Sequence, residues 1–300
     1  MASVSHPQEE KEHGNPERRG LKKGLYVIPS AFTAANVGMG FYAVMAALRG
    51  FQLVGMGTAD DLQRAAEHFD NAAKAIGWAV LFDMLDGRIA RMTKTTTEIG
   101  VQFDSIADVL TFGIAPAVLA YAWGYGSALV EGSWAHKLGW FLSFMYLMCG
   151  AFRLARFNVQ AARPRILAEG TAKVDKKNFI GLPIPPAAAL IASIIHFAPK
   201  PLLQYPARYI ALYSGLMMAL VGCLGALMVS TIRYSSFKTV GTSSRSTRLA
   251  ILFIAAFGML IYLFSEYALL ILVVIYVLHG PVLRLGGLFR RRSARPAETS

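Results

Sequence analysis

Four aspartates in one stretch of the chain have the spacing of a cation site. Asp83 and Asp86 are three residues apart, and Asp104 and Asp108 are four apart, so each pair shares one face if its segment is helical. The short stretch between the pairs lets the two helices lie antiparallel, with the carboxylates facing one another. Carboxylate oxygens suit Mg²⁺ and Mn²⁺, and four of them can hold two such ions for a displacement at phosphorus. We therefore predict a site for two divalent cations, Mg²⁺ or Mn²⁺, at these aspartates.

Small residues beside the aspartates would let a ligand approach the helix backbone. Gly87 and Ala90 follow the first pair, and Gly100 precedes the second pair. The alternative interpretation is a set of helix-end aspartates paired with arginines. A lone Asp-x-x-Asp would favour that alternative, whereas the whole pattern favours the cation site.

The composition indicates that a membrane surrounds these helices. Of the 300 residues, 55% are hydrophobic and 16% are charged, and the mean hydropathy is +0.43. A soluble domain carries nearer a quarter charged residues, so the surplus apolar surface requires lipid. We predict an all-α fold, a polytopic transmembrane helical bundle, and an amphipathic extracytoplasmic helix within residues 50–71. About eight spans are expected, at residues 30–48, 72–90, 103–125, 138–156, 183–199, 208–230, 249–264 and 267–284.

The basic residues predict the orientation of the bundle. With the N-terminus inside, 24 of the 30 lysines and arginines fall on the cytoplasmic side, as the positive-inside rule requires. We therefore expect cytoplasmic N- and C-termini and a cell-membrane protein whose active site faces the cytoplasm. The net charge of +12 follows this topology, so no nucleic-acid partner is expected. Because the start of the chain is polar, we expect no cleavable secretory signal there.

The same patterns divide the chain into four predicted parts. Residues 1–28 form a cytoplasmic tail with a possible interfacial helix, and residues 29–238 form the catalytic membrane domain. Residues 239–286 contain a loop and two C-terminal transmembrane helices, and residues 287–300 form a basic cytoplasmic tail.

The aspartate segment resembles a known enzyme signature. Residues 83–108 fit Asp-x-x-Asp-Gly-x-x-Ala-Arg, a gap, and Gly-x-x-x-Asp-x-x-x-Asp, the pattern of the CDP-alcohol phosphotransferase family. The resemblance implies that the four aspartates bind two metals that hold the CDP diphosphate, and that Asp108 activates the acceptor hydroxyl as the catalytic residue. It also implies nucleotide contacts around Gly87 and Ala90. The predicted nucleotide- and diphosphate-binding residues are Gly87, Ala90, Arg91, Gly100 and Thr33.

Other stretches resemble the bacterial and archaeal phosphatidylserine synthases within that family. They begin at Pro29, Phe152, Gly181 and Leu227, so the resemblance covers roughly residues 29–238. Ser30 departs from the usual Pro-Asn start. The resemblance implies that CDP-diacylglycerol and L-serine react to give phosphatidylserine and CMP, in a homodimer within the lipid bilayer.

An amino-acid acceptor would bring a carboxylate, for which an arginine fork is well suited. The predicted serine-binding residues are Arg153, Arg156, Asn36 and Asn158. For the arginines, an equal alternative is membrane anchoring by snorkelling to lipid phosphates. For Thr33 and Asn36, the satisfaction of helix-end backbone groups is an equal alternative.

Three alternatives for the function remain open at this point. The first is the same chemistry with glycerol 3-phosphate, inositol phosphate or choline as the acceptor. The second is an ion-coupled transporter, because intramembrane carboxylates also mark ion paths. The third is a structural relative without activity, against which the complete set of four aspartates argues.

Overall fold

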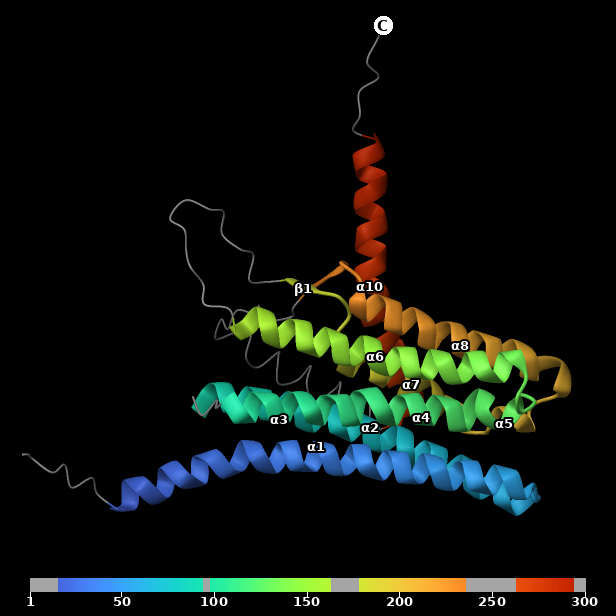
Figure 1. The fold of residues 1–300 in the computed structure, drawn as a ribbon, viewed down its shortest axis with the longest axis horizontal. Helices are drawn as coiled ribbons and strands as arrows, with labels where there is room; N and C mark the ends of the chain where they lie inside the picture. Colours follow the sequence, from blue (N-terminus) through green and yellow to red (C-terminus); the bar gives the residue numbers. More distant parts are fainter. Residues whose placement is uncertain (1–15, 94–97, 163–177, 236–262, 294–300) are drawn as a thin grey trace, which may run out of the picture.

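The computed structural model describes residues 16–93, 98–162, 178–235 and 263–293. Most of these residues form long helices that lie side by side, and α10 extends out of the bundle toward the C-terminus (Figure 1). The helices are α1 (Pro16–Met56), α2 (Ala59–Thr93), α3 (Glu98–Asp108), α4 (Ala115–Ala120), α5 (Gly126–Ala128), α6 (Trp134–Ala162), α7 (Ile184–Phe197), α8 (Ala207–Val229) and α10 (Ser265–Ser293). Two π-helical segments, η1 (Val109–Ile114) and η2 (Tyr121–Tyr125), and a short 3₁₀ helix, η3 (Leu202–Gln204), complete them.

The prediction of a polytopic helical bundle is confirmed. Six of the described segments are long and apolar enough to cross a bilayer: Ala31–Met56, Ile99–Ala128, Trp134–Val159, Ile184–Gln204, Ala207–Val229 and Ser265–Arg284. The predicted span at 72–90 lies in α2, which is helical but is not among the six. Its charged residues, such as Lys74 and Asp83, lower its hydropathy. The predicted span at 249–264 lies almost entirely outside the described residues.

The helix predicted within residues 50–71 belongs to two longer helices, because α1 contains residues 50–56 and α2 begins at Ala59. A turn at Gly57 and Thr58 joins them, and Gly57 has a positive φ of 76°, which glycine adopts without strain. The backbone N–H of Asp61 donates to Thr58 Oγ1 at 3.2 Å, and the Thr58 hydroxyl donates to the Asp61 carboxylate at 2.5 Å. This side-chain cap resembles a capping box and starts α2 directly after the turn.

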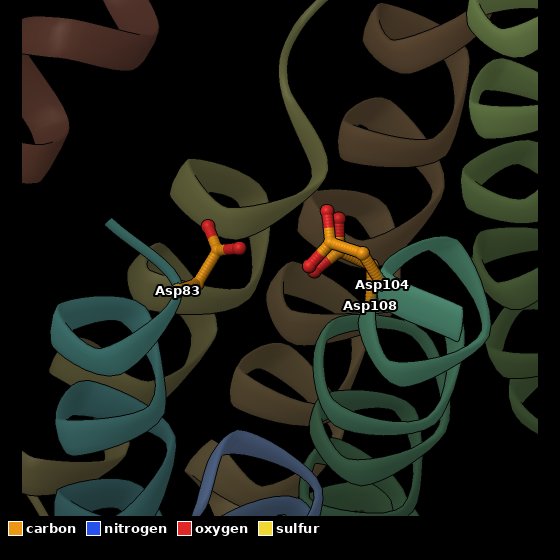
Figure 2. A group of neighbouring side chains, drawn as sticks. All are labelled: Asp83, Asp104 and Asp108. Carbon is orange, nitrogen blue, oxygen red and sulfur yellow. The ribbon is translucent and has the colours of Figure 1, made fainter. Parts of the chain in front are cut away.

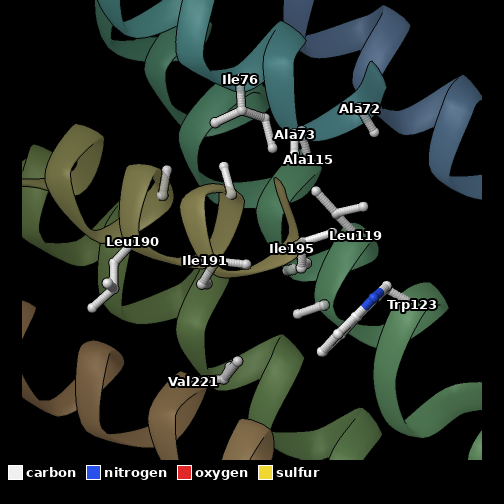
Figure 3. Close-up of a cluster of buried hydrophobic side chains, with 14 of the residues drawn as sticks. Ala72, Ala73, Ile76, Ala115, Leu119, Trp123, Leu190, Ile191, Ile195 and Val221 are labelled. Atoms are coloured by element: carbon white, nitrogen blue, oxygen red, sulfur yellow. The ribbon is translucent and has the colours of Figure 1, made fainter. Parts of the chain in front are cut away.

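Small residues allow the helices to approach closely, which is how membrane helices commonly pack. Buried alanines line both α1 and α2, among them Ala43 and Ala72. At Gly40 of α1, an added Cβ would lie 2.4 Å from Thr111 Oγ1 of η1, so only glycine fits there. A larger apolar cluster forms where α2, α4, η2 and α7 meet (Figure 3). It includes Ile76, Leu119, Trp123, Ile191 and Ile195.

Two three-residue strands depart from the all-α expectation. β1 (Asn178–Ile180) and β2 (Arg233–Ser235) pair antiparallel, with Phe179 opposite Tyr234. Gly181 follows β1 with a φ of 82° and donates its N–H to the Ile232 carbonyl at 2.8 Å. A Cβ at this glycine would lie 2.3 Å from the Met228 carbonyl oxygen. The stretches beginning at Gly181 and Leu227, far apart in sequence, are therefore in direct contact.

Candidate active site

Three of the four predicted aspartates converge at one end of the bundle. Asp83 projects from α2, whereas Asp104 and Asp108 project from successive turns of α3, and the carboxylates face one another (Figure 2). One carboxylate oxygen from each residue lies within 4.8 Å of the other two. The helical spacing therefore produces the predicted arrangement, with ligand oxygens from two helices around one point.

The helix that carries Asp104 and Asp108 changes its geometry directly after the second aspartate. α3 ends at Asp108, and the π-helical segment η1 begins at Val109. Tyr146 of α6 donates its hydroxyl to the Phe112 carbonyl at 3.1 Å, and Thr111 donates its hydroxyl to the Asn36 carbonyl at 3.2 Å. π-helical segments inside α-helices are frequent at functional sites. These contacts with α1 and α6 hold the irregular segment, and thereby hold Asp108.

Asp86 is connected to helix α1 by a hydrogen bond. It is 6% exposed and accepts a hydrogen bond from the Thr33 hydroxyl of α1. It is also near enough to Asp104 for the two carboxylates to repel each other. The structure thus brings all four aspartates into one region, with Asp86 held from the side of α1.

The chemistry of these donors fits a divalent cation. Asp108 Oδ1 is buried and has no hydrogen-bond partner in the described part of the chain. Buried carboxylates this close repel one another, and an unpaired buried charge is expensive. A hard cation with oxygen ligands would offset both costs. Asp83, Asp104 and Asp108 are therefore able to hold a metal.

The predicted nucleotide-binding residues adjoin the aspartates in sequence, except for Thr33 of α1. Gly87 is half-buried in α2 directly after Asp86, and Gly100 is exposed in the first turn of α3. Thr33 is 6% exposed, and its hydrogen bond to Asp86 gives it a role in positioning that carboxylate. Ala90 and Arg91 belong to the last turns of α2, but their side chains lie outside the described part of the structure.

The predicted serine-binding residues occupy three different environments. Arg153 of α6 interacts electrostatically with Asp108, and its Nε is buried with no hydrogen-bond partner among the described residues. Arg156 is half-buried one turn further along α6. Asn158 donates from Nδ2 to Ser105 Oγ of α3 at 2.8 Å, so it joins α6 to α3. Asn36 is 1% exposed, and neither its Nδ2 nor its Oδ1 has a partner in the described ranges.

Sequence reasoning missed one residue beside this site, Tyr276 of α10. Its hydroxyl interacts electrostatically with Arg153. In the sequence, Tyr276 is a single tyrosine in an apolar run, which is typical of an ordinary membrane-interface residue. Only the packing of α10 against the bundle brings it to the site.

Comparison with known proteins identifies the class to which this helical membrane protein belongs. The family model of the CDP-alcohol phosphatidyltransferases matches residues 26–221. The chain therefore belongs to the CDP-alcohol phosphatidyltransferase family, a family of enzymes. This result confirms the resemblance found from the aspartate signature and argues against the transporter alternative.

Three relatives carry the name CDP-diacylglycerol–serine O-phosphatidyltransferase. The protein of Helicobacter pylori (strain ATCC 700392 / 26695) is 30% identical over 258 residues, which cover 85% of this chain and 90% of the relative. The Saccharomyces cerevisiae protein is 34% identical over 192 residues, covering 64% of this chain and 60% of the relative. The Methanocaldococcus jannaschii protein is 30% identical over 167 residues, which cover 56% of this chain and 65% of the relative.

Proposed function

We propose that this enzyme transfers the phosphatidyl group of CDP-diacylglycerol to the hydroxyl of L-serine, giving phosphatidylserine and CMP. The observation that carries the proposal is the convergence of Asp83, Asp104 and Asp108 within 4.8 Å. The names of the relatives support serine as the acceptor. Glycerol 3-phosphate, inositol phosphate and choline remain the alternative acceptors, because the aspartate signature does not distinguish one acceptor alcohol from another.

The aspartates are proposed to hold two divalent cations, Mg²⁺ or Mn²⁺, through Asp83, Asp86, Asp104 and Asp108. When bound, such cations neutralise the diphosphate charge and polarise the phosphoryl oxygens. Thr33 orients the Asp86 carboxylate for this role through its hydrogen bond. Gly87, Ala90, Arg91 and Gly100 are proposed to contact the nucleotide and its diphosphate, since they adjoin the aspartates in sequence.

The reaction is proposed to be a direct displacement at the phosphorus that bears the diacylglycerol oxygen. The serine oxygen forms a bond to this phosphorus, and the bond from phosphorus to the bridging diphosphate oxygen breaks, so that CMP leaves with the electron pair. Asp108 accepts the proton from the serine hydroxyl.

Arg153 is the proposed partner of the serine carboxylate. Its guanidinium is near Asp108, so a serine whose hydroxyl meets Asp108 would bring its carboxylate toward Arg153. A guanidinium binds a carboxylate through two parallel hydrogen bonds. Arg156, Asn36 and Asn158 remain candidate contacts, and Asn36 is the stronger of the two asparagines because its buried amide lacks a partner among the described residues.

The enzyme is proposed to act in the cell membrane as a homodimer, with both termini and the aspartate end of the bundle on the cytoplasmic side. The distribution of lysine and arginine supports this orientation. Serine and CMP are water-soluble, so an active site on the cytoplasmic side would let both exchange with the cell interior. The chain is proposed to have four parts: a cytoplasmic tail (residues 1–28), the catalytic membrane domain (29–238), a loop with two C-terminal transmembrane helices (239–286) and a basic cytoplasmic tail (287–300).

Release of CMP by the purified protein tests the proposal. The protein in detergent receives CDP-diacylglycerol and Mn²⁺ or Mg²⁺, and then serine, glycerol 3-phosphate, inositol phosphate or choline in separate reactions. We expect CMP release with serine and formation of a serine-containing lipid. The Asp108→Asn variant should lower kcat by roughly 10²- to 10⁴-fold while changing the KM for serine much less. Faster release with another acceptor than with serine would contradict the proposed acceptor.

A further inference from the structure

Helix α10 lies beyond residues 26–221, the part of the chain that the family model matches, yet it reaches the proposed site. Tyr276 of α10 interacts electrostatically with Arg153 of α6, and Arg153 interacts with Asp108 in the same way. Interactions therefore run from α10 to the proposed catalytic carboxylate through a single guanidinium.

A specific set of contacts fixes α10 at this point. Pro281 lies inside α10, and proline has no N–H to donate to the carbonyl four residues earlier, that of Val277. The Tyr234 hydroxyl of β2 donates to this carbonyl at 3.4 Å. Tyr234 is fully buried. This one hydrogen bond therefore satisfies both the tyrosine hydroxyl and the Val277 carbonyl, which water does not reach.

The ring of Tyr234 also determines where Tyr276 lies. The two rings are 6.1 Å apart between centroids, with an interplanar angle of 28°. A Cβ on Gly280 would lie 2.5 Å from the Tyr234 ring, so the absence of a side chain there lets the ring reach α10. Tyr234 thus packs against the proline-containing turn of α10 and against Tyr276, the tyrosine that interacts electrostatically with Arg153.

One nitrogen of the Arg153 guanidinium leaves room for a further partner. Its Nε is buried and has no partner within the described ranges. Asp108, the nearby carboxylate, is proposed to act on the cations and the acceptor hydroxyl. A phenol oxygen can accept a hydrogen bond from a guanidinium N–H, and it does so without competing for the metal. Tyr276 is the residue whose chemistry fits this role.

We infer that Tyr276 is a positioning residue that orients the Arg153 guanidinium toward the carboxylate of the acceptor, so that α10 takes part in acceptor selection. This inference rests on the proposed function, because it assumes an acceptor with a carboxylate. In this role Tyr276 would act through Arg153 and not on the diphosphate or the cations. Its loss should therefore affect serine and leave CDP-diacylglycerol largely unaffected.

The test is the Tyr276→Phe variant, which keeps the ring and its packing on Tyr234 and removes only the hydroxyl. Loss of one hydrogen bond should raise the apparent KM for serine by roughly 2- to 13-fold. The KM for CDP-diacylglycerol and the thermal midpoint in detergent should stay close to those of the parent protein. Tyr267→Phe is the matched control, because Tyr267 lies on the same helix and is 56% exposed.

A double-mutant cycle separates positioning from a general structural effect. If Tyr276 acts through Arg153, Tyr276→Phe should change the serine KM little further in an Arg153→Lys background. Independent, additive effects would overturn the inference, and so would an unchanged serine KM in the single variant. If the parent protein releases CMP no faster with serine than without it, the proposed function itself is contradicted. This result on the parent protein distinguishes failure of the proposed function from failure of the inference about Tyr276.

Discussion

Thr33 on α1 donates a hydrogen bond from its hydroxyl to the carboxylate of Asp86 on α2. The two residues are 53 positions apart in the chain, and both are at least nine-tenths buried. The bond constrains which way the Asp86 carboxylate points, while Asp83, Asp104 and Asp108 form a close group of their own. A residue first predicted to bind the nucleotide thus supports a proposed metal ligand.

Removing this hydroxyl should weaken the response to metal. In Thr33→Val, we expect the Mg²⁺ or Mn²⁺ concentration for half-maximal activity to rise by about tenfold or more, because a hydrogen bond to a charged group contributes about 1.5–3 kcal/mol. Thr33→Ser keeps the hydroxyl and should respond to metal like the parent protein. Titration of CMP release against metal makes the measurement, and identical titration curves for Thr33→Val and the parent would show that the bond does not support the metal site.

Arg153 and Arg156 should differ in their effect on serine. Arg153→Lys keeps the charge and loses the planar fork, so the apparent KM for serine should rise by about 10- to 150-fold. Arg156→Lys is the matched control one turn away, and we expect it to change this KM much less because Arg153 is the arginine near Asp108. Steady-state kinetics at saturating CDP-diacylglycerol measure the serine KM of both variants. If both values equal that of the parent protein, the arginines are membrane anchors and do not bind serine.

The sequence predicted that Asp83, Asp104 and Asp108 lie together, as the structure shows, because helical periodicity determines which side chains share a face. Spacings of three and four residues put Asp83 with Asp86, and Asp104 with Asp108, in any helix. The short connection between the two segments then left few ways to arrange them. The same logic predicted the long helices, whose apolar runs are a strong and local signal.

Contacts between distant segments could not be predicted in this way. The Tyr234–Val277 bond depends on Pro281 leaving a carbonyl unsatisfied 43 residues from the tyrosine. The strands β1 and β2 are three residues long, which is too short for an alternating pattern to appear. The turn at Gly57 was not predicted, because the polar residues indicated one helix within residues 50–71, whereas the Thr58–Asp61 cap begins α2 directly after this turn.

A second polar cluster, distant from the aspartate site, should contribute to stability. His196 of α7 is 7% exposed and is hydrogen-bonded to Asp70 of α2 at 2.5 Å and to Ser265 of α10 at 2.9 Å. Lys74 lies 2.6 Å from the other Asp70 oxygen. Asp70→Asn should lower the thermal midpoint in detergent at neutral pH by a few degrees, since weakening the bonds of a buried histidine costs about 1–3 kcal/mol.

The pH dependence of this effect has a definite sign. Burial alone would raise the pKa of Asp70, but the hydrogen bonds with His196 and Lys74 outweigh it and hold the pKa below its usual range. A carboxyl whose pKa is lower in the folded state stabilises the fold above its unfolded pKa, and this contribution is lost as the pH falls through the folded value. The difference in midpoint between parent and Asp70→Asn should therefore shrink below about pH 4. Asp60→Asn is the control, because the Asp60–Arg64 pair is exposed and should contribute little; an equal loss in both variants would contradict this account.

The proposed orientation predicts which loops an impermeant thiol reagent reaches. In a chain whose Cys149 and Cys223 have been replaced, Thr95→Cys should resist labelling in intact cells and react after permeabilisation. Val130→Cys is the matched control between α5 and α6, where Val130 is 79% exposed, and it should react in intact cells. Labelling of Thr95→Cys with protection of Val130→Cys would invert the proposed topology.

Removing and restoring the metal tests the central claim most directly. The claim is that the aspartates bind divalent cations on which transfer of the phosphatidyl group to serine depends. Purified protein is treated with EDTA, freed of the chelator, and assayed for CMP release from CDP-diacylglycerol with serine, before and after Mg²⁺ or Mn²⁺ is returned. We expect the parent protein to lose its activity and to recover it with metal, whereas Asp104→Asn should recover little. Full turnover of the parent protein in a rigorously metal-free sample would contradict the account.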